Sequence, residues 1–307
     1  MRLRSVYAAL VLVQVFFAML PIALKFALRE LSSPALALVR VTGAALLFWV
    51  LQRSLTGERV RGRRDYLLLA AYAVFGVVAN QLLYITALTL TTATAAQTLV
   101  AAGPAMTLLI AIVARKEKAT PAKWLGIALA GSGALYLIGV GLGTGSGLGN
   151  LLAFLNVCCY SVYLVISRGL LRRYDALTVI TWVFVFGAVG MLPWGTLPLA
   201  REAGGVSAST WLLALGIVLF PTVGAYYLNI LALKHVESSI VSVFVYLQPP
   251  LTALLAVPAL GEHPSPRLIP AALLIFSGVA VTVWEGRRER LRRGEAPSPA
   301  EQEMVEP

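Results

Sequence analysis

The sequence predicts an all-α membrane protein with ten transmembrane helices, arranged as two five-helix repeats of inverted topology with both termini in the cytoplasm. Three observations carry this prediction: the composition, an internal repeat and the distribution of basic residues. Of the 307 residues, 59% are hydrophobic and only 13% are charged. Because so few polar side chains cannot cover a globule of this size, the chain belongs in a bilayer.

Ten apolar segments are long enough to cross the hydrocarbon as helices. A bilayer admits only helices and closed barrels, and the alternation typical of barrel strands is absent here. The predicted spans are residues 6–28, 35–51, 66–88, 93–114, 124–140, 148–167, 176–197, 211–233, 239–260 and 268–284.

The first span follows Met1-Arg2-Leu3-Arg4, so a cleavable signal peptide is its alternative interpretation. The segment is longer than the usual apolar core of a signal. It also matches the sixth span at a shift of 142, which places Gln14 on Asn156. We therefore expect it to remain as the first helix.

An internal repeat divides the chain. Residues 66–135 recur at residues 211–280 with a constant shift of 145, so that Pro104 lies on Pro249 and Glu117 on Glu262. Since each copy contains an odd number of spans, the second must be inverted in the bilayer relative to the first. The predicted organisation is a first repeat at 1–140, a glycine-rich linker at 141–150, a second repeat at 148–285 and a disordered tail at 286–307.

Basic residues give the orientation. Twenty of the 25 Lys and Arg residues fall in the termini and loops of one side. The loops of the other side hold three, Arg29, Arg201 and Arg267. The positive-inside bias then places both termini in the cytoplasm, and the formal charge of +11 encodes topology rather than nucleic-acid binding.

Several kinds of chemistry are disfavoured. The glycine-rich linker has spacings of a dinucleotide fingerprint but no strand precedes it. Cys158 and Cys159 are adjacent in one span, which disfavours a structural disulfide. The spans offer no metal cluster and no nucleophile with a base, so we expect no enzyme activity, metal or cofactor. No Asp or Glu lies deep in a span, so the sequence shows no obvious proton-carrying residue. Whether transport is coupled to protons or is facilitated diffusion therefore stays open.

The order of motifs resembles a known family. Pro104, Glu117 and Pro121 are mirrored by Pro249, Glu262 and Pro266, and Gly131-Ser132-Gly133 is partly matched by Ser277-Gly278. With ten spans, this pattern resembles the EamA-type exporters of the drug/metabolite transporter superfamily, over residues 6–285. The first helix departs from the family by having Phe17-Ala18-Met19-Leu20-Pro21 in place of a common tryptophan-glycine pair.

In carriers built from inverted repeats, the substrate binds near the midplane between the halves. Polar residues deep in the spans, especially those paired by the repeat, are therefore candidates, although interhelical hydrogen bonding is their alternative role. The predicted substrate-binding residues are Gln14, Asn80, Gln81, Tyr84, Gln97, Asn156, Tyr160, Tyr163, Tyr226, Asn229, Ser242 and Tyr246.

Two cations and four prolines complete the candidate set. Lys25 and Arg40 lie in spans near the predicted outer side, where they either reach the interface, with Glu30 nearby, or bind a substrate carboxylate at the outer mouth. Prolines free backbone carbonyls inside helices, and the predicted hinges are Pro21, Pro104, Pro249 and Pro250.

The resemblance implies an exporter of amino acids or related small metabolites in the bacterial cytoplasmic (inner) membrane, working by alternating access around a central cavity. The alternative is a lipid-linked or amphiphilic-drug carrier of the same superfamily. A lateral opening lined by Lys25 and Arg40 would favour lipid. The expected partners are a small-molecule substrate and membrane lipid, without nucleic acid, for a monomer or homodimer.

Overall fold

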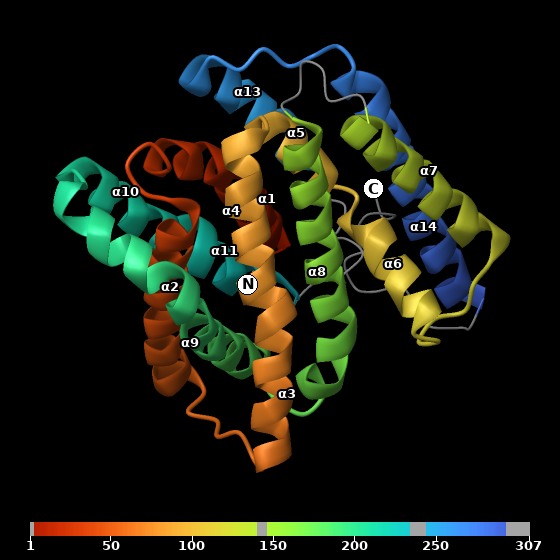
Figure 1. Ribbon diagram of the computed structural model, residues 1–307. Coiled ribbons are helices and arrows are strands. Elements are labelled where there is room, and N and C mark those ends of the chain that lie inside the picture. The colour runs from red at the N-terminus through yellow and green to blue at the C-terminus, as the bar shows by residue number, and fades with distance from the viewer. Residues whose placement is uncertain (1–2, 140–145, 234–243, 293–307) are drawn as a thin grey trace.

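The computed structural model describes residues 3–139, 146–233 and 244–292, which form an all-helical bundle without strands (Figure 1). Within these residues nine helical segments are long and apolar enough to cross a membrane, and Val245–Leu260 is a shorter apolar helix. These segments correspond to the ten predicted spans. The all-helical transmembrane fold is thereby confirmed.

The first half contains five successive helical spans. The third is interrupted by a π-helix, and the fourth is broken between its two helices. The elements are α1 Leu3–Ala27, α2 Ser33–Leu55, α3 Arg63–Ala73, the π-helix η1 Val74–Ala79, α4 Asn80–Leu90, α5 Ala93–Val100, α6 Gly103–Val113 and α7 Pro121–Gly139.

The second half has a comparable order, again with a π-helix in its third span. The elements are α8 Gly147–Leu171, α9 Ala176–Glu202, the 3-10 turn η2 Ala203–Gly205, α10 Ala208–Ile217, the π-helix η3 Val218–Gly224, α11 Ala225–Leu233, the 3-10 turn η4 Val245–Leu247, α13 Gln248–Leu260 and α14 Leu268–Arg292.

Two predicted boundaries are corrected by these helices. Helix α8 begins at Gly147, inside the predicted linker 141–150, because the Ser146 side chain caps its first turn by accepting the Gly149 N–H at 3.0 Å. Helix α14 continues to Arg292, so residues 286–292 of the predicted disordered tail are helical. Arginine and glutamate are good helix formers, so the helix continues past Gly286, where the candidate span ends.

Helices related by the 145-residue repeat pack in equivalent ways. Helix α4 packs on α8 as α11 packs on α1, and α6 packs on α8 as α13 packs on α1. Two further pairs join equivalent helices directly: α2 packs on α9 at one edge of the molecule, and α7 on α14 at the other (Figure 1). This is the packing expected of two similar units that face each other.

Glycines bring α7 and α14 unusually close. A Cβ atom on Gly133 would lie 2.8 Å from the Ala271 carbonyl oxygen, and one on Gly278 would overlap the Gly126 carbonyl oxygen. The repeat places Gly133 on Gly278 and Gly126 on Ala271. Small residues at such positions let two membrane helices approach backbone to backbone.

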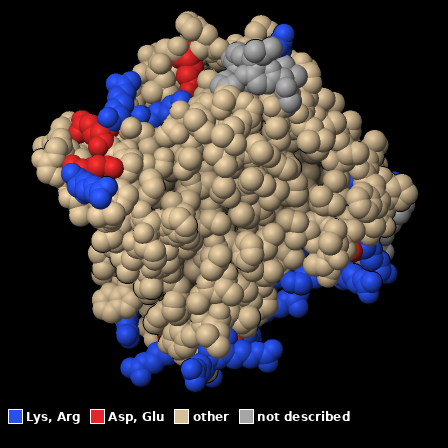
Figure 2. Space-filling model, in the orientation of Figure 1, with Lys and Arg blue, Asp and Glu red and all other residues tan. Residues whose placement is uncertain are grey.

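The loops gather at two ends of the bundle. At one end Tyr174 donates to Asp65 at 2.7 Å and Arg168 pairs with Glu117 at 3.3 Å. At the other end Ser207 donates to Glu30. Figure 2 shows Lys and Arg gathered at the lower end of the molecule below a broad middle zone with few charges. These two groups of loops are the ones that the sequence assigns to opposite sides.

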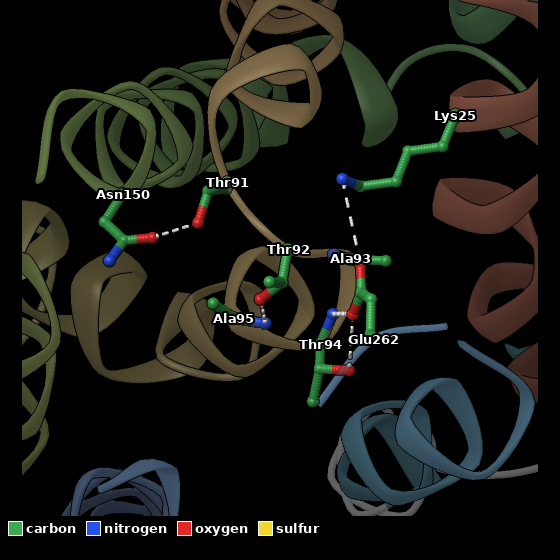
Figure 3. A network of polar contacts seen from close by, with 8 residues as sticks. All are labelled: Lys25, Thr91, Thr92, Ala93, Thr94, Ala95, Asn150 and Glu262. Atoms are coloured by element: carbon green, nitrogen blue, oxygen red, sulfur yellow. Dashed lines mark hydrogen bonds and ion pairs between the residues drawn. The ribbon is translucent and has the colours of Figure 1, made fainter. Parts of the chain in front are cut away.

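The first helix of each half runs in the opposite direction. Contacts between α1 and α13 progress from Gln14 with Gln248 to Lys25 with Glu262, so α1 ends at the Glu262 end of the bundle. Helix α8 begins at that end, where Asn150 bonds to Thr91 (Figure 3).

Candidate functional site

Two π-helices lie at matching positions of the two halves. The 145-residue shift carries η1, Val74–Ala79, onto residues 219–224 of η3, Val218–Gly224. In η3 the wide turn contains Pro221, whose missing N–H removes one backbone bond. Its counterpart in η1 is Gly76. Such wide turns are frequent at functional sites, and here each directly precedes polar residues in the middle of a span.

The first polar group is a chain of three glutamines and one tyrosine. Gln248 donates to Gln14 at 2.6 Å, Gln97 donates to Gln248 at 2.5 Å and the Tyr84 hydroxyl donates to Gln97 at 3.0 Å. All four side chains are buried. The chain joins α13, α1, α5 and α4 inside the bundle.

The second polar group is built around Arg40. Its Nη1 donates to Gln81 Oε1 at 2.6 Å, and its Nε donates to Thr222 Oγ1 at 3.0 Å. Gln81 in turn donates to Asn80 at 3.2 Å. Asn80 and Asn156 each donate from the side-chain amide to the other's backbone carbonyl, at 3.4 and 2.9 Å. This group joins α2, α4 and η3 to α8.

Three tyrosines form the third group. The Tyr160 hydroxyl donates to that of Tyr226, and the rings of Tyr160 and Tyr163 lie 5.8 Å apart. A Cβ atom on Gly76 would lie 2.7 Å from the Tyr163 ring, so the π-helix η1 makes room for this side chain. All three tyrosines are only half-buried, whereas the two polar groups above are buried. The tyrosines therefore keep accessible surface inside their spans.

Three predicted residues are not part of these groups. The Tyr246 ring packs on Phe276 with centroids 5.3 Å apart, and its buried hydroxyl lacks a hydrogen-bond partner within the described ranges. Asn229 follows Tyr226 by almost one turn of α11, and its side-chain oxygen likewise has no partner there. Ser242 lies outside the described residues.

The predicted hinge prolines occupy two kinds of position. Pro104 is in the first turn of α6, directly after the break at Ala101–Ala102 that separates α5 from α6. Pro249 and Pro250 are in the first turn of α13, directly after a 3-10 turn. Pro21 lies inside the continuous helix α1. Hinge motion at these positions stays a prediction.

Arg40 does not reach the interface, so that interpretation is wrong for this residue. Its side chain is 4% exposed, because Gln81 and Thr222 offer acceptors inside the bundle. Glu30, expected nearby, accepts hydrogen bonds from the backbone and hydroxyl of Ser207 instead. These bonds lower the pKa of the Glu30 carboxyl.

Lys25 takes part in a network at the Glu262 end of the bundle (Figure 3). The Glu262 carboxylate accepts the backbone N–H of Ala93 at 2.6 Å, together with the backbone N–H and hydroxyl of Thr94 at 3.2 and 3.0 Å. Lys25 Nζ lies 3.7 Å from the same carboxylate. The network ties the ends of α13, α5 and α1, which are the helices that carry Gln248, Gln97 and Gln14.

Sequence reasoning missed Gln248, Thr222 and Pro221. Their counterparts in the repeat are Gly103, Val77 and Gly76. Pairing polar residues by the repeat excludes these positions, because in none of the three pairs are both members polar. The available signal was a single amide or hydroxyl deep in an apolar span, next to Pro249 in one case and Pro221 in the other.

Comparison with known proteins follows the same division of the chain. The model of the EamA-like transporter family matches twice, at residues 4–139 and 147–284. The chain belongs to the EamA-like transporter family. Its relatives, too, are named as transporters rather than enzymes.

Two relatives of this EamA-like protein cover nearly all of it. A probable terminal-alkyne amino-acid exporter of Streptantibioticus cattleyicolor is 28% identical over 97% of this chain and 99% of its own length. An uncharacterized transporter of Archaeoglobus fulgidus is 27% identical over 84% of this chain and 90% of its own. A crystal structure of another protein is similar over 93% of this chain and 98% of its own chain, with a TM-score of 0.58. At 20% sequence identity, this similarity shows that the two proteins share a fold.

Proposed function

We propose that this EamA-like transporter exports amino acids or related small metabolites by alternating access, with substrate bound between its two halves. The observation that carries the proposal is the group of half-buried tyrosines, Tyr160, Tyr163 and Tyr226, beside buried amides in the middle of the bundle. Aromatic rings with hydroxyl groups suit a small solute that is partly apolar and partly polar.

The two-state mechanism rests on the relation between the halves. Helices α1 and α8 run in opposite directions, and equivalent helices pack in equivalent ways. Two inverted units can exchange conformations, which opens the centre first to one side and then to the other. The Glu262 network ties the outer ends of three helices in the present state, so we place the closed gate of this state there.

Export and amino acids are the direction and cargo named for the Streptantibioticus relative. The proposal includes a location in the bacterial cytoplasmic membrane as a multi-pass protein. The distribution of basic residues supports an orientation with both termini in the cytoplasm. The buried polar groups contain no carboxylate within the described part of the chain, so the proposal includes no proton-carrying acid.

A lipid-linked or amphiphilic substrate is the second candidate, because the surface carries an apolar groove of about 530 Å³. The groove lies between α2, α9 and α10, where an acyl chain would fit. Its lining contains neither Lys25 nor Arg40, so it lacks the cations expected at a lateral opening for a charged lipid. This difference favours the metabolite.

Uptake into liposomes containing the purified protein tests the proposal. In one assay, liposomes preloaded with substrate are given a panel of amino acids, including one with a terminal alkyne, and uptake is measured. In a second assay, scrambling of a fluorescent lipid between the two leaflets is measured. Saturable, mutually competing uptake of amino acids supports the proposal, and lipid scrambling without amino-acid uptake would favour the second candidate. Tyr163→Phe should weaken uptake, whereas Tyr136→Phe on the exposed face of α7 is the matched control.

A further inference from the structure

We infer that Arg40 binds the carboxylate of the transported substrate. The inference rests on the proposed function as a carrier of small metabolites, and it names the chemical group that the site recognises. It places recognition in the interior of the bundle, beside the tyrosines, rather than at the outer mouth.

The first argument is charge. Arg40 is 4% exposed, and its hydrogen-bond acceptors, Gln81 Oε1 and Thr222 Oγ1, are neutral. The ion pairs among the described residues all lie at helix ends and loops, and none includes Arg40. A buried cation without a counterion is strongly unfavourable. The carboxylate of a substrate supplies the missing negative charge.

Lys25 provides the contrast within the same chain. It is another cation inside a described span, and it is partly exposed and paired with Glu262 at 3.7 Å. Its charge is therefore already compensated by the protein. Arg40 alone combines burial in a described span with neutral partners.

The second argument is geometry. A guanidinium carries five N–H donors in a planar fork that matches a carboxylate with two parallel bonds. Gln81 and Thr222 take one bond each, from Nη1 and Nε. These two bonds fix the plane of the fork while other donors remain for a ligand. The Thr222 hydroxyl also donates to the Ile217 carbonyl five residues earlier, which fixes it to the π-turn.

The third argument is position. Arg40 and Gln81 come from the first half of the chain, and Thr222 comes from the second. Tyr84 and Tyr226 are ionisable side chains close to Arg40, and the Tyr226 hydroxyl accepts a hydrogen bond from the half-buried Tyr160. A carboxylate on Arg40 would thus lie between the two halves, with the rest of the substrate against the tyrosines.

A purely structural role for Arg40 makes a different prediction. A tether between α2, α4 and η3 needs only neutral donors, so Arg40→Gln would then change stability without changing which substrates are preferred. The decisive readout is therefore the ratio of affinities for a carboxylate and its uncharged amide. Two matched pairs serve as probes, leucine with leucinamide and pentanoate with pentanamide.

The experiment measures competition of these four compounds for uptake in liposomes. The wild type should prefer each carboxylate over its amide. In Arg40→Gln the affinity for the carboxylates should fall by on the order of 100-fold while the affinity for the amides stays unchanged, so the preference is lost. Arg40→Lys should retain part of the preference. Arg53→Gln, on the exposed end of the same helix, should behave as the wild type. A folded Arg40→Gln or Arg40→Lys protein with the wild-type ratio would overturn the inference.

The outcomes separate the inference from the function. Preference for pentanoate without transport of any amino acid would support Arg40 as the carboxylate site and reject amino acids as cargo. Transport that prefers the amides would reject the Arg40 inference and leave the carrier function standing. If no compound is transported, the proposed function fails. In that case the melting temperature of the purified protein is measured with each compound. A larger increase with the carboxylates than with the amides would support Arg40 as the carboxylate site, and equal increases would contradict it.

Discussion

Glu262 lies at the N-terminus of α5, where its carboxylate accepts the Ala93 N–H at 2.6 Å. The first N–H groups of a helix have no partners within the helix, and their partial positive charge favours an anion. Its repeat counterpart, Glu117, instead pairs with Lys123 and Arg168 at the opposite end of the bundle. Equivalent acidic residues therefore make different contacts at the two ends, as expected when one end is closed.

Removal of the Glu262 carboxylate should open the outer end. Glu262→Ala loses three hydrogen bonds and the ion pair with Lys25, so we expect the closed state to lose about 1–3 kcal/mol. With Cys158 and Cys159 replaced by Ala, a cysteine at the buried Thr98 position should react roughly tenfold faster with an impermeant thiol reagent from outside. Glu117→Ala is the control, and an equal increase there would argue against a gate at Glu262.

The α7–α14 contact should depend on the glycines that face the partner backbone. Gly278→Val forces apart backbones that now touch at Gly126, and such overpacking typically costs about 1–3 kcal/mol. The melting temperature of the purified protein should fall. Gly131→Val is the matched control, since nothing lies within 4 Å of a Cβ atom at that position of α7. Similar melting temperatures for the two variants would contradict this account of the contact.

The position of Tyr163 should depend on the π-helix η1. In Gly76→Ala the new methyl group would lie 2.7 Å from the Tyr163 ring, so the ring must move. We expect a higher KM for transport with little loss of folded protein, because Tyr163 is half-buried and has room to shift. Gly216→Ala, at a position in α10 with open space around it, should leave KM unchanged. An unchanged KM in both variants would mean that Tyr163 does not contact substrate.

Thr222 should matter through its hydroxyl rather than its size. Thr222→Val keeps the shape but removes the acceptor for Arg40 and the donor to Ile217, which should destabilise the protein by about 1–2 kcal/mol and weaken transport. Thr196→Val removes a comparable hydrogen bond to the Leu192 carbonyl, but at an exposed position. The free energy of unfolding, measured by denaturation, should therefore change little in this control. Equal effects of the two substitutions would show that the buried hydroxyl has no special role.

The sequence predicted the spans well, because apolar length is a property of each segment alone. Pro104, one of the predicted hinges, directly follows the break between α5 and α6, although the sequence analysis predicted a single span over 93–114. The π-helix η1 was not predicted, because Val74–Ala79 contains no proline, and the close contact of Gly76 with the Tyr163 ring is not visible in the sequence. Tertiary contacts rather than local composition decide such a turn.

The candidate site was predictable where both copies kept a polar residue. Gln14 and Asn156 form such a pair, and both lie in the buried polar groups. Gln248 was missed because its counterpart is Gly103. Arg40 was noticed only as a cation near a helix end, since the sequence does not show that Gln81 and Thr222 would surround it.

A structure determined with a transported amino acid bound tests the central claim most directly. The account predicts the ligand between the two halves, with its carboxylate on Arg40 and its side chain against Tyr163 and Tyr226. A ligand in the apolar groove between α2, α9 and α10, with the polar groups around Arg40 unchanged, would contradict it.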